Sequence, residues 1–90
     1  MTKSRDEGIT TAFSAVLKQL RQAHGLSQEE LALISGIDRT SVSRLEAGSR
    51  QPSLSLIFSI AQAVDQTPQK VVAMVHREWS KTHSSEAGGE

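Results

Sequence analysis

Apolar residues recur at helical intervals along most of the chain, whereas the alternation typical of a strand is absent. Between residues 9 and 24 they stand three or four positions apart, which predicts a first helix with one buried face. That face is expected to hold Ile9, Phe13, Val16, Leu17 and Leu20. Gly25 is expected to end the helix, and Leu26 is placed for the apolar contact of a Schellman cap.

A short second helix is predicted by its capping residues. Ser27 and Glu30 have the spacing of a capping box, in which each side chain bonds to an otherwise unpaired backbone N–H of the other residue. A helix is therefore expected from Gln28, with a buried side that holds Leu31, Ala32 and Ile34. Gly36 can adopt the positive φ that ends a helix, so the chain is expected to turn there.

A third helix is expected from Arg39, with Asp38 as its N-cap. Val42 and Leu45 stand three positions apart and predict its buried face. The opposite face is then polar and cationic, and consists of Arg39, Thr40, Ser43 and Arg44. Ala32 is small enough to let the second and third helices cross closely. This is the geometry of a helix-turn-helix, whose second helix enters the major groove of DNA.

A fourth helix is expected after a loop. Gly48 is predicted to end the third helix, and residues 49–52 form the loop before Ser53 caps the fourth. Its inner face is expected to hold Leu54, Ile57, Ile60, Ala61 and Val64. Leu56 and Phe58 fall on other faces, so they are not expected to be buried in the core of a single copy.

A fifth helix follows a second turn. Asp65 stands where the fourth helix should end, and aspartate tolerates the left-handed conformation better than most residues. Thr67 and Pro68 form an N-cap and N1 pair for the fifth helix. Its apolar positions are Val71, Val72, Val75 and Trp79.

These elements predict an all-α fold, a compact domain of five helices over residues 9–80. Residues 1–8 are polar and mixed in charge and are expected to form a flexible N-terminal arm. Residues 81–90 have no apolar pattern and are expected to be a disordered tail.

Composition narrows the classes of function. The chain has 90 residues and no cysteine, which excludes disulfides and cysteine-ligated zinc. No apolar run approaches the ~18 residues of a membrane span and no signal segment is present, so we expect a cytoplasmic protein that does not contact membranes. Basic and acidic residues number 10 each, so a nucleic-acid binder would depend on where its charges lie.

Catalysis is not expected. His24, His76 and His83 accompany no nucleophile motif, and the chain has no glycine-rich phosphate loop. His76 with Glu78 is too sparse for a metal site. We therefore expect no enzyme activity, no metal and no cofactor.

One segment resembles a known family. Residues 25–54, GLSQEELALISGIDRTSVSRLEAGSRQPSL, are similar to the phage-repressor (Cro/cI) or Xre class of helix-turn-helix proteins, and look closest to the restriction–modification controller proteins. The similarity extends less sharply from Ala12 to Val75. It implies a lambda-repressor-like five-helix domain that binds double-stranded DNA and regulates transcription.

The resemblance also implies roles for individual residues. It makes the polar face of the third helix the base-contacting face, namely Arg39, Thr40, Ser43 and Arg44. The alternative is an ordinary solvated helix face. Contacts to phosphate are expected from Gln28, Ser41, Ser49 and Arg50. The family pairs a glutamate at the end of the third helix with an arginine of the first, which corresponds here to an ion pair of Glu46 with Arg21.

The surplus apolar residues suggest self-association. A two-fold interface is expected to include Phe58, Val72, Met74, Val75 and Trp79. Such a homodimer would place two reading helices ~34 Å apart and require a roughly palindromic operator. Alternatively, the fifth helix packs only on its own domain.

A rival function is an antitoxin-like or adapter module with a protein partner. The sequence does not separate a repressor from an activator.

Overall fold

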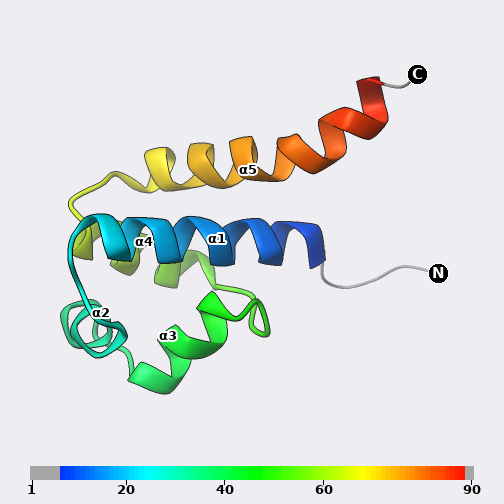
Figure 1. Ribbon diagram of the computed structural model, residues 1–90. Helices are drawn as coiled ribbons and strands as arrows, with labels where there is room; N and C mark the ends of the chain where they lie inside the picture. The colour runs from blue at the N-terminus through cyan, green and yellow to red at the C-terminus, as the bar shows by residue number, and fades with distance from the viewer. Residues whose placement is uncertain (1–6, 89–90) are drawn as a thin grey trace.

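The computed structural model describes residues 7–88, with side chains as far as Lys81. This part of the chain forms five helices: α1 (Glu7–Ala23), α2 (Gln28–Ser35), α3 (Arg39–Glu46), α4 (Leu54–Ala63) and α5 (Pro68–Gly88). Helix α1 lies between α5 on one side and the α2–α3 pair on the other (Figure 1). The predicted all-α, five-helix fold is therefore confirmed.

Every helix contributes to a single apolar core. The largest fully buried side chains include Phe13 and Leu17 of α1, Leu31 of α2, Leu45 of α3 and Ile60 of α4. Val71 of α5 closes this core and is 1% exposed. Burying a side chain of this size stabilises the fold by roughly 1.5–3 kcal/mol, so the core fixes the positions of α2 and α3.

Helices α1 and α4 end in the same way. At the end of α1, Gly25 has a φ of 66°, and the N–H of Leu26 bonds to the carbonyl of Arg21 at 3.1 Å, as the Schellman prediction requires. At the end of α4, Asp65 takes the corresponding conformation with a φ of 55°, and Gln66 N–H bonds to Ala61 O at 2.8 Å. The prediction of a left-handed Asp65 is confirmed.

Four of the burial predictions are wrong. Ile9 is 43% exposed, Ile34 56% and Leu54 70%, whereas Leu56 is 8% exposed and belongs to the core. In α4 the buried row follows steps of four from Leu56, which leaves Leu54 and Phe58 on a second row that faces solvent. Helix α2 ends one residue after Ile34, so no later turn brings a neighbouring helix over that side chain.

The ends of the domain also differ from expectation. Helix α1 begins at Glu7, inside the predicted arm, and α5 continues past Ser80 to Gly88. Residues 81–87 contain neither glycine nor proline, so nothing in the sequence breaks the helix before Gly88. The rest of the predicted arm and tail, residues 1–6 and 89–90, lies outside the described residues. Within the described part, no helix has the length and apolar character needed to cross a membrane.

Candidate nucleic-acid interface

Helices α2 and α3 form a unit that is fixed by local hydrogen bonds. The Glu30 N–H donates to Ser27 Oγ at 3.0 Å, and the Ser27 N–H donates to Glu30 Oε1 at 2.8 Å, which completes the capping box. Gly36 ends α2 with a φ of 75°, and the Ile37 N–H bonds back to Ala32 O at 3.0 Å. Ala32 is 3% exposed where the helices pack. The predicted helix–turn–helix is therefore present.

Helix α3 turns one face inward and one face to solvent. Val42 and Leu45 are fully buried. Arg39, Thr40 and Arg44 are exposed, and Ser43 is half-buried at the border of the same face. The predicted base-contacting residues thus lie together on the outer side of α3. Helix α3 itself lies at the edge of the molecule away from α5 (Figure 1).

The carboxyl end of α3 is anchored to α1. Arg21 Nε contacts Glu46 Oε2 at 2.5 Å, and Arg21 Nη2 donates to Glu46 Oε1 at 3.0 Å, so the pair is bidentate. Arg21 Nη1 donates to the backbone oxygen of Leu26 at 2.7 Å. Only 13% of the Arg21 side chain and 2% of the Glu46 side chain are exposed. The structure therefore brings the predicted pair together in a buried position.

The surroundings of this pair favour the ionised form of both side chains. Burial acts to raise the pKa of Glu46, but the hydrogen bonds from Arg21 and Gln28 outweigh it and hold that pKa below its ordinary value. The hydrogen bond to Glu46 raises the pKa of Arg21. Both groups are consequently ionised at neutral pH, and the negative charge of Glu46 is compensated inside the protein.

Gln28 makes a contact that the sequence does not predict. Its Nε2 donates to Glu46 Oε1 at 3.0 Å, so the side chain of the first residue of α2 reaches the last residue of α3. Gln28 therefore adds a third donor to the Glu46 carboxylate, beside the two nitrogens of Arg21.

The amino end of α3 carries a second, exposed network. The Ser41 hydroxyl donates to Asp38 Oδ1 at 2.7 Å, and Arg50 Nη1 donates to Ser41 Oγ at 2.8 Å. The hydrogen bond from Ser41 lowers the pKa of Asp38 and outweighs desolvation, which acts to raise that pKa. The charge of Arg50 makes a smaller contribution that also lowers it. Ser49 Oγ donates to the backbone oxygen of Arg44 at 3.2 Å. Ser49 and Arg50 therefore lie beside α3, and Ser41 belongs to its first turn.

The role of Asp38 differs from the N-cap that the sequence predicts. Its backbone has N-cap geometry, but its carboxylate makes no capping hydrogen bond. The spacing of Asp38 and Ser41, three residues apart on a helix start, is a signal that could have suggested their contact. No local pattern predicts the contact of Arg50 with Ser41, because that contact depends on the path of the loop after α3.

The predicted dimer residues lie in different environments. Phe58 is 54% exposed and Val72 is 48% exposed. Met74, Val75 and Trp79 are half-buried, and the first two pack against the core.

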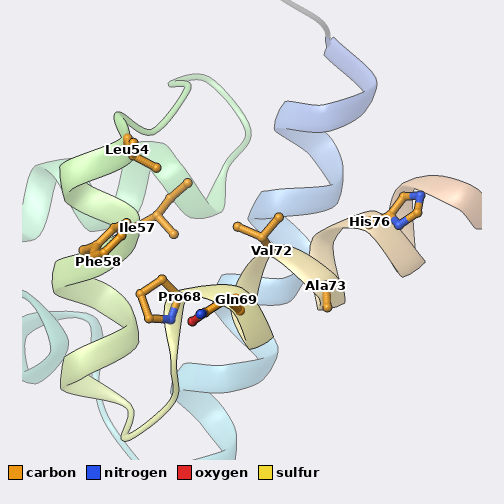
Figure 2. A pocket seen from close by; sticks show the side chains of 8 residues that line it. All are labelled: Leu54, Ile57, Phe58, Pro68, Gln69, Val72, Ala73 and His76. Carbon is orange, nitrogen blue, oxygen red and sulfur yellow. The ribbon is translucent and has the colours of Figure 1, made fainter.

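A groove of about 700 Å³ runs between α4 and α5 beside the exposed pair Phe58 and Val72. Figure 2 shows its lining: Leu54, Ile57 and Phe58 come from α4, and Pro68, Gln69, Val72, Ala73 and His76 come from α5.

Comparison with known proteins supports the helix-turn-helix assignment. The helix-turn-helix family model HTH_3 matches residues 17–71, which include α2, α3 and α4 whole. The chain belongs to this family. Curated relatives of the chain are named as HTH-type transcriptional regulators. One from Methanocaldococcus jannaschii is 44% identical over 46 residues, which is 51% of this chain and 70% of that regulator.

A longer relative from Sinorhizobium fredii is 35% identical over 56 residues, but the match spans 62% of this chain and only 29% of that protein. Among solved structures, the restriction–modification controller protein C.AhdI from Aeromonas hydrophila is 44% identical, with a TM-score of 0.67 over 69% of this chain and 94% of that one. The controller protein C.Esp1396I is 29% identical, with a TM-score of 0.74 over 81% and 95%. One structure of C.Esp1396I is a tetramer in complex with its natural 35 base-pair operator.

Proposed function

We propose that this protein is a sequence-specific, double-stranded DNA-binding regulator of transcription that acts as a dimer in the cytoplasm. The observation that carries the proposal is the exposed polar face of α3, which holds Arg39, Thr40 and Arg44 on a helix whose other face is fully buried. A rigid helix with a cationic outer face suits the major groove. The operator-bound structure of C.Esp1396I supports the same use of the fold.

In this proposal base contacts come from the outer face of α3. Arg39 and Arg44 can each fork onto the edge of a guanine, and Thr40 and Ser43 can bond to several bases. Neither arginine has a side-chain hydrogen bond or ion pair within the described part of the chain. Both guanidinium groups are thus available to a base edge without breaking a contact in the protein.

Phosphate contacts come from the flanks of the same face. Ser49 and Arg50 in the loop after α3, with Gln28 at the start of α2 and Ser41, are the proposed contacts, and they set the register of the helix on the duplex. Gln28 keeps its backbone N–H at the positive end of α2 while its side chain binds Glu46, so its contact is proposed for the backbone.

The formal net charge of the chain is zero. This is compatible with DNA binding because the acidic group at the carboxyl end of α3 is neutralised. Glu46 is bound by Arg21 and Gln28 and is 2% exposed. A phosphate that approaches α3 therefore meets the exposed arginines and not an open carboxylate at that end. With 10 positive and 10 negative residues overall, binding to random DNA should be weak.

Selection of bound sequences from a random duplex pool tests the proposal. At moderate salt, the protein should enrich an inverted repeat whose half-sites lie about one DNA turn apart. If a folded protein enriches no sequence, the proposal is refuted and the rival of an antitoxin-like or adapter module becomes the better account. Hetero-association that salt does not weaken would then identify the partner as a protein.

The proposed dimer interface is the apolar surface of α4 and α5. Phe58 and Val72 are its exposed members, and Trp79, Val75 and Met74 contribute their accessible edges. Phe58→Ala should lower the molecular mass measured by sedimentation at micromolar concentration, and Trp79→Ala should act in the same direction. Leu33→Ala is the matched control, because Leu33 is 81% exposed on α2, outside this surface. An unchanged mass in both interface variants would exclude the surface.

A further inference from the structure

The N-cap of α3 behaves differently from the N-caps of α2, α4 and α5. In those helices Ser27, Ser53 and Thr67 each accept a backbone N–H through the side-chain oxygen, at 3.0, 3.1 and 3.1 Å. Asp38 has the extended backbone of an N-cap, with φ −90° and ψ 158°, but makes no such bond. Aspartate is among the best capping residues, so its carboxylate has been diverted to another partner.

The partner of Asp38 is Ser41, which in turn binds Arg50. The Ser41 hydroxyl lies 2.7 Å from Asp38 Oδ1 and 2.8 Å from Arg50 Nη1. A guanidinium group has only donors, so Ser41 must accept from Arg50. Its single proton is then donated to Asp38. The chain of bonds Arg50 to Ser41 to Asp38 consequently has one possible direction.

This network holds the Arg50 side chain in a defined position. Arg50 belongs to the loop after α3, yet its guanidinium lies beside Ser41 in the amino-terminal half of that helix. In a helix-turn-helix this is the end of the reading helix that contacts base edges. A long loop side chain that is already placed there loses less rotamer freedom when it binds.

We propose that Asp38 is a positioning residue for DNA recognition, which holds the Arg50 guanidinium beside the amino end of α3 through the Ser41 hydroxyl. The inference rests on the DNA-binding function proposed above. Ser41 is then a bridge, a role that replaces the direct phosphate contact proposed for it above, because its single proton is donated to Asp38. Arg50 makes the phosphate contact at a fixed distance from the base-reading face. A phosphate contact that is fixed relative to the reading face favours the register in which the bases also match.

If Asp38 acted on DNA binding only through its charge, its loss would change the affinity in the opposite direction from loss of a positioning role. A carboxylate close to a phosphate repels it, so loss of the charge without any positioning role would tighten binding to every duplex. Loss of the positioning role weakens binding to the preferred duplex. The sign of the change in affinity therefore separates the two.

The test is a double-mutant cycle on the duplex enriched by selection and on an unrelated duplex of equal length. Ser41→Ala should weaken binding to the enriched duplex about threefold to tenfold, as expected for loss of one charge-assisted hydrogen bond, and binding to the unrelated duplex less than about twofold. In an Arg50→Ala background, Ser41→Ala should have no further effect. An equal loss in both backgrounds, or no loss in the wild-type background, would overturn the proposal.

Conservative variants complete the experiment. Ser41→Thr keeps the hydroxyl and should bind like wild type, and Asp38→Asn keeps an acceptor and should retain the preference for the enriched duplex. Asp38→Ala should reduce this preference by about the same factor as Ser41→Ala, and it provides the same test if Ser41→Ala does not fold. Equal tightening on both duplexes by Asp38→Ala would overturn the positioning role. If the wild-type protein binds no duplex at all, the DNA-binding function itself is refuted, which is a separate result.

Discussion

The two ends of α3 each join an arginine to a carboxylate, but their surroundings differ. At the carboxyl end, Arg21 and Glu46 are in direct contact and their side chains are only 13% and 2% exposed. At the amino end, Asp38 and Arg50 are exposed and meet only through Ser41. Similar chemical groups therefore stand in a buried and in a solvated setting within one short helix.

The difference teaches what burial does to a charged pair. When a buried pair loses one partner, the remaining charge has no water to replace it, so the pair is expensive to break. In an exposed pair water substitutes for the lost partner, and the contribution to stability is small. We infer that the carboxyl end of α3 is an anchor for the fold, whereas the contacts at the amino end contribute little to stability and serve the placement of Arg50.

The largest effect is expected from Arg21→Ala. The Glu46 side chain is 2% exposed in the wild-type protein, and this change leaves it with Gln28 as its remaining side-chain donor. The free energy of unfolding should fall by about 3–5 kcal/mol. Urea denaturation at pH 7 measures it. Lys81→Ala is the control, because the pair Lys81–Glu78 is exposed and its loss should cost less than about 1 kcal/mol. Similar losses in the two variants would contradict the anchor.

A smaller, pH-dependent effect is expected from Glu46→Gln. The pKa of Glu46 is lowered in the folded protein, so its contribution is complete above the unfolded-state pKa and is lost as the pH falls through the lowered folded-state pKa. At pH 7 the variant should be less stable by about 1.5–3 kcal/mol. Denaturation between pH 7 and pH 3 should show the difference from wild type shrinking once the pH is below about 4.5, near the ordinary pKa of glutamate.

The matched control for this pH series is Asp38→Asn. The pKa of Asp38 is also lowered, mainly by Ser41, but the carboxylate is exposed. Its difference from wild type should therefore change far less over the same pH range. A larger change for Asp38 than for Glu46 would reverse the comparison.

A still smaller effect is expected from Gln28→Ala. The variant removes one hydrogen bond to Glu46 and leaves the bidentate pair with Arg21, so the loss in the free energy of unfolding should be about 1 kcal/mol. Gln62→Ala, at an exposed position of α4, provides the control. If Gln28→Ala is as stable as this control, Gln28 has no part in the anchor.

The smallest change in stability is expected at the amino end. Asp38→Ala and Ser41→Ala remove only exposed or half-exposed hydrogen bonds, so thermal unfolding should shift less than in any variant of the anchor. Their effect is expected on DNA binding instead. A loss of stability as large as that of Arg21→Ala would show that both ends of α3 are structural.

Much of the fold could be predicted because its signals are local. The capping box of Ser27 and Glu30, the turn at Gly36 and the left-handed Asp65 each depend on a few neighbouring residues, and the structure has all of them. Burial was harder to predict in short helices. Ile34 and Leu54 fit an apolar pattern, but the position of the neighbouring helices decides which side of α2 and α4 is covered.

The candidate site shows the same limit. The placement of Arg39, Thr40 and Arg44 on one exposed face follows from the spacing of Val42 and Leu45. The contacts of Gln28 with Glu46 and of Arg50 with Ser41 join residues 18 and nine positions apart, and depend on the angle between α2 and α3 and on the path of a loop. Sequence spacing holds no information about either.

The measurement that tests the central claim most directly compares Arg44→Ala with Arg50→Ala. Their affinities for the enriched duplex, for duplexes with single base changes and for unrelated DNA are measured over a range of salt concentrations. Arg44→Ala should lose about 1–3 kcal/mol of discrimination at defined base pairs. Arg50→Ala should weaken binding to all duplexes and reduce the salt slope by about 1. Its loss on the enriched duplex should be larger by the factor found for Ser41→Ala, but single base changes should be discriminated as in wild type. Equal effects of the two variants on every duplex would contradict a division between base reading by α3 and phosphate contact beside it.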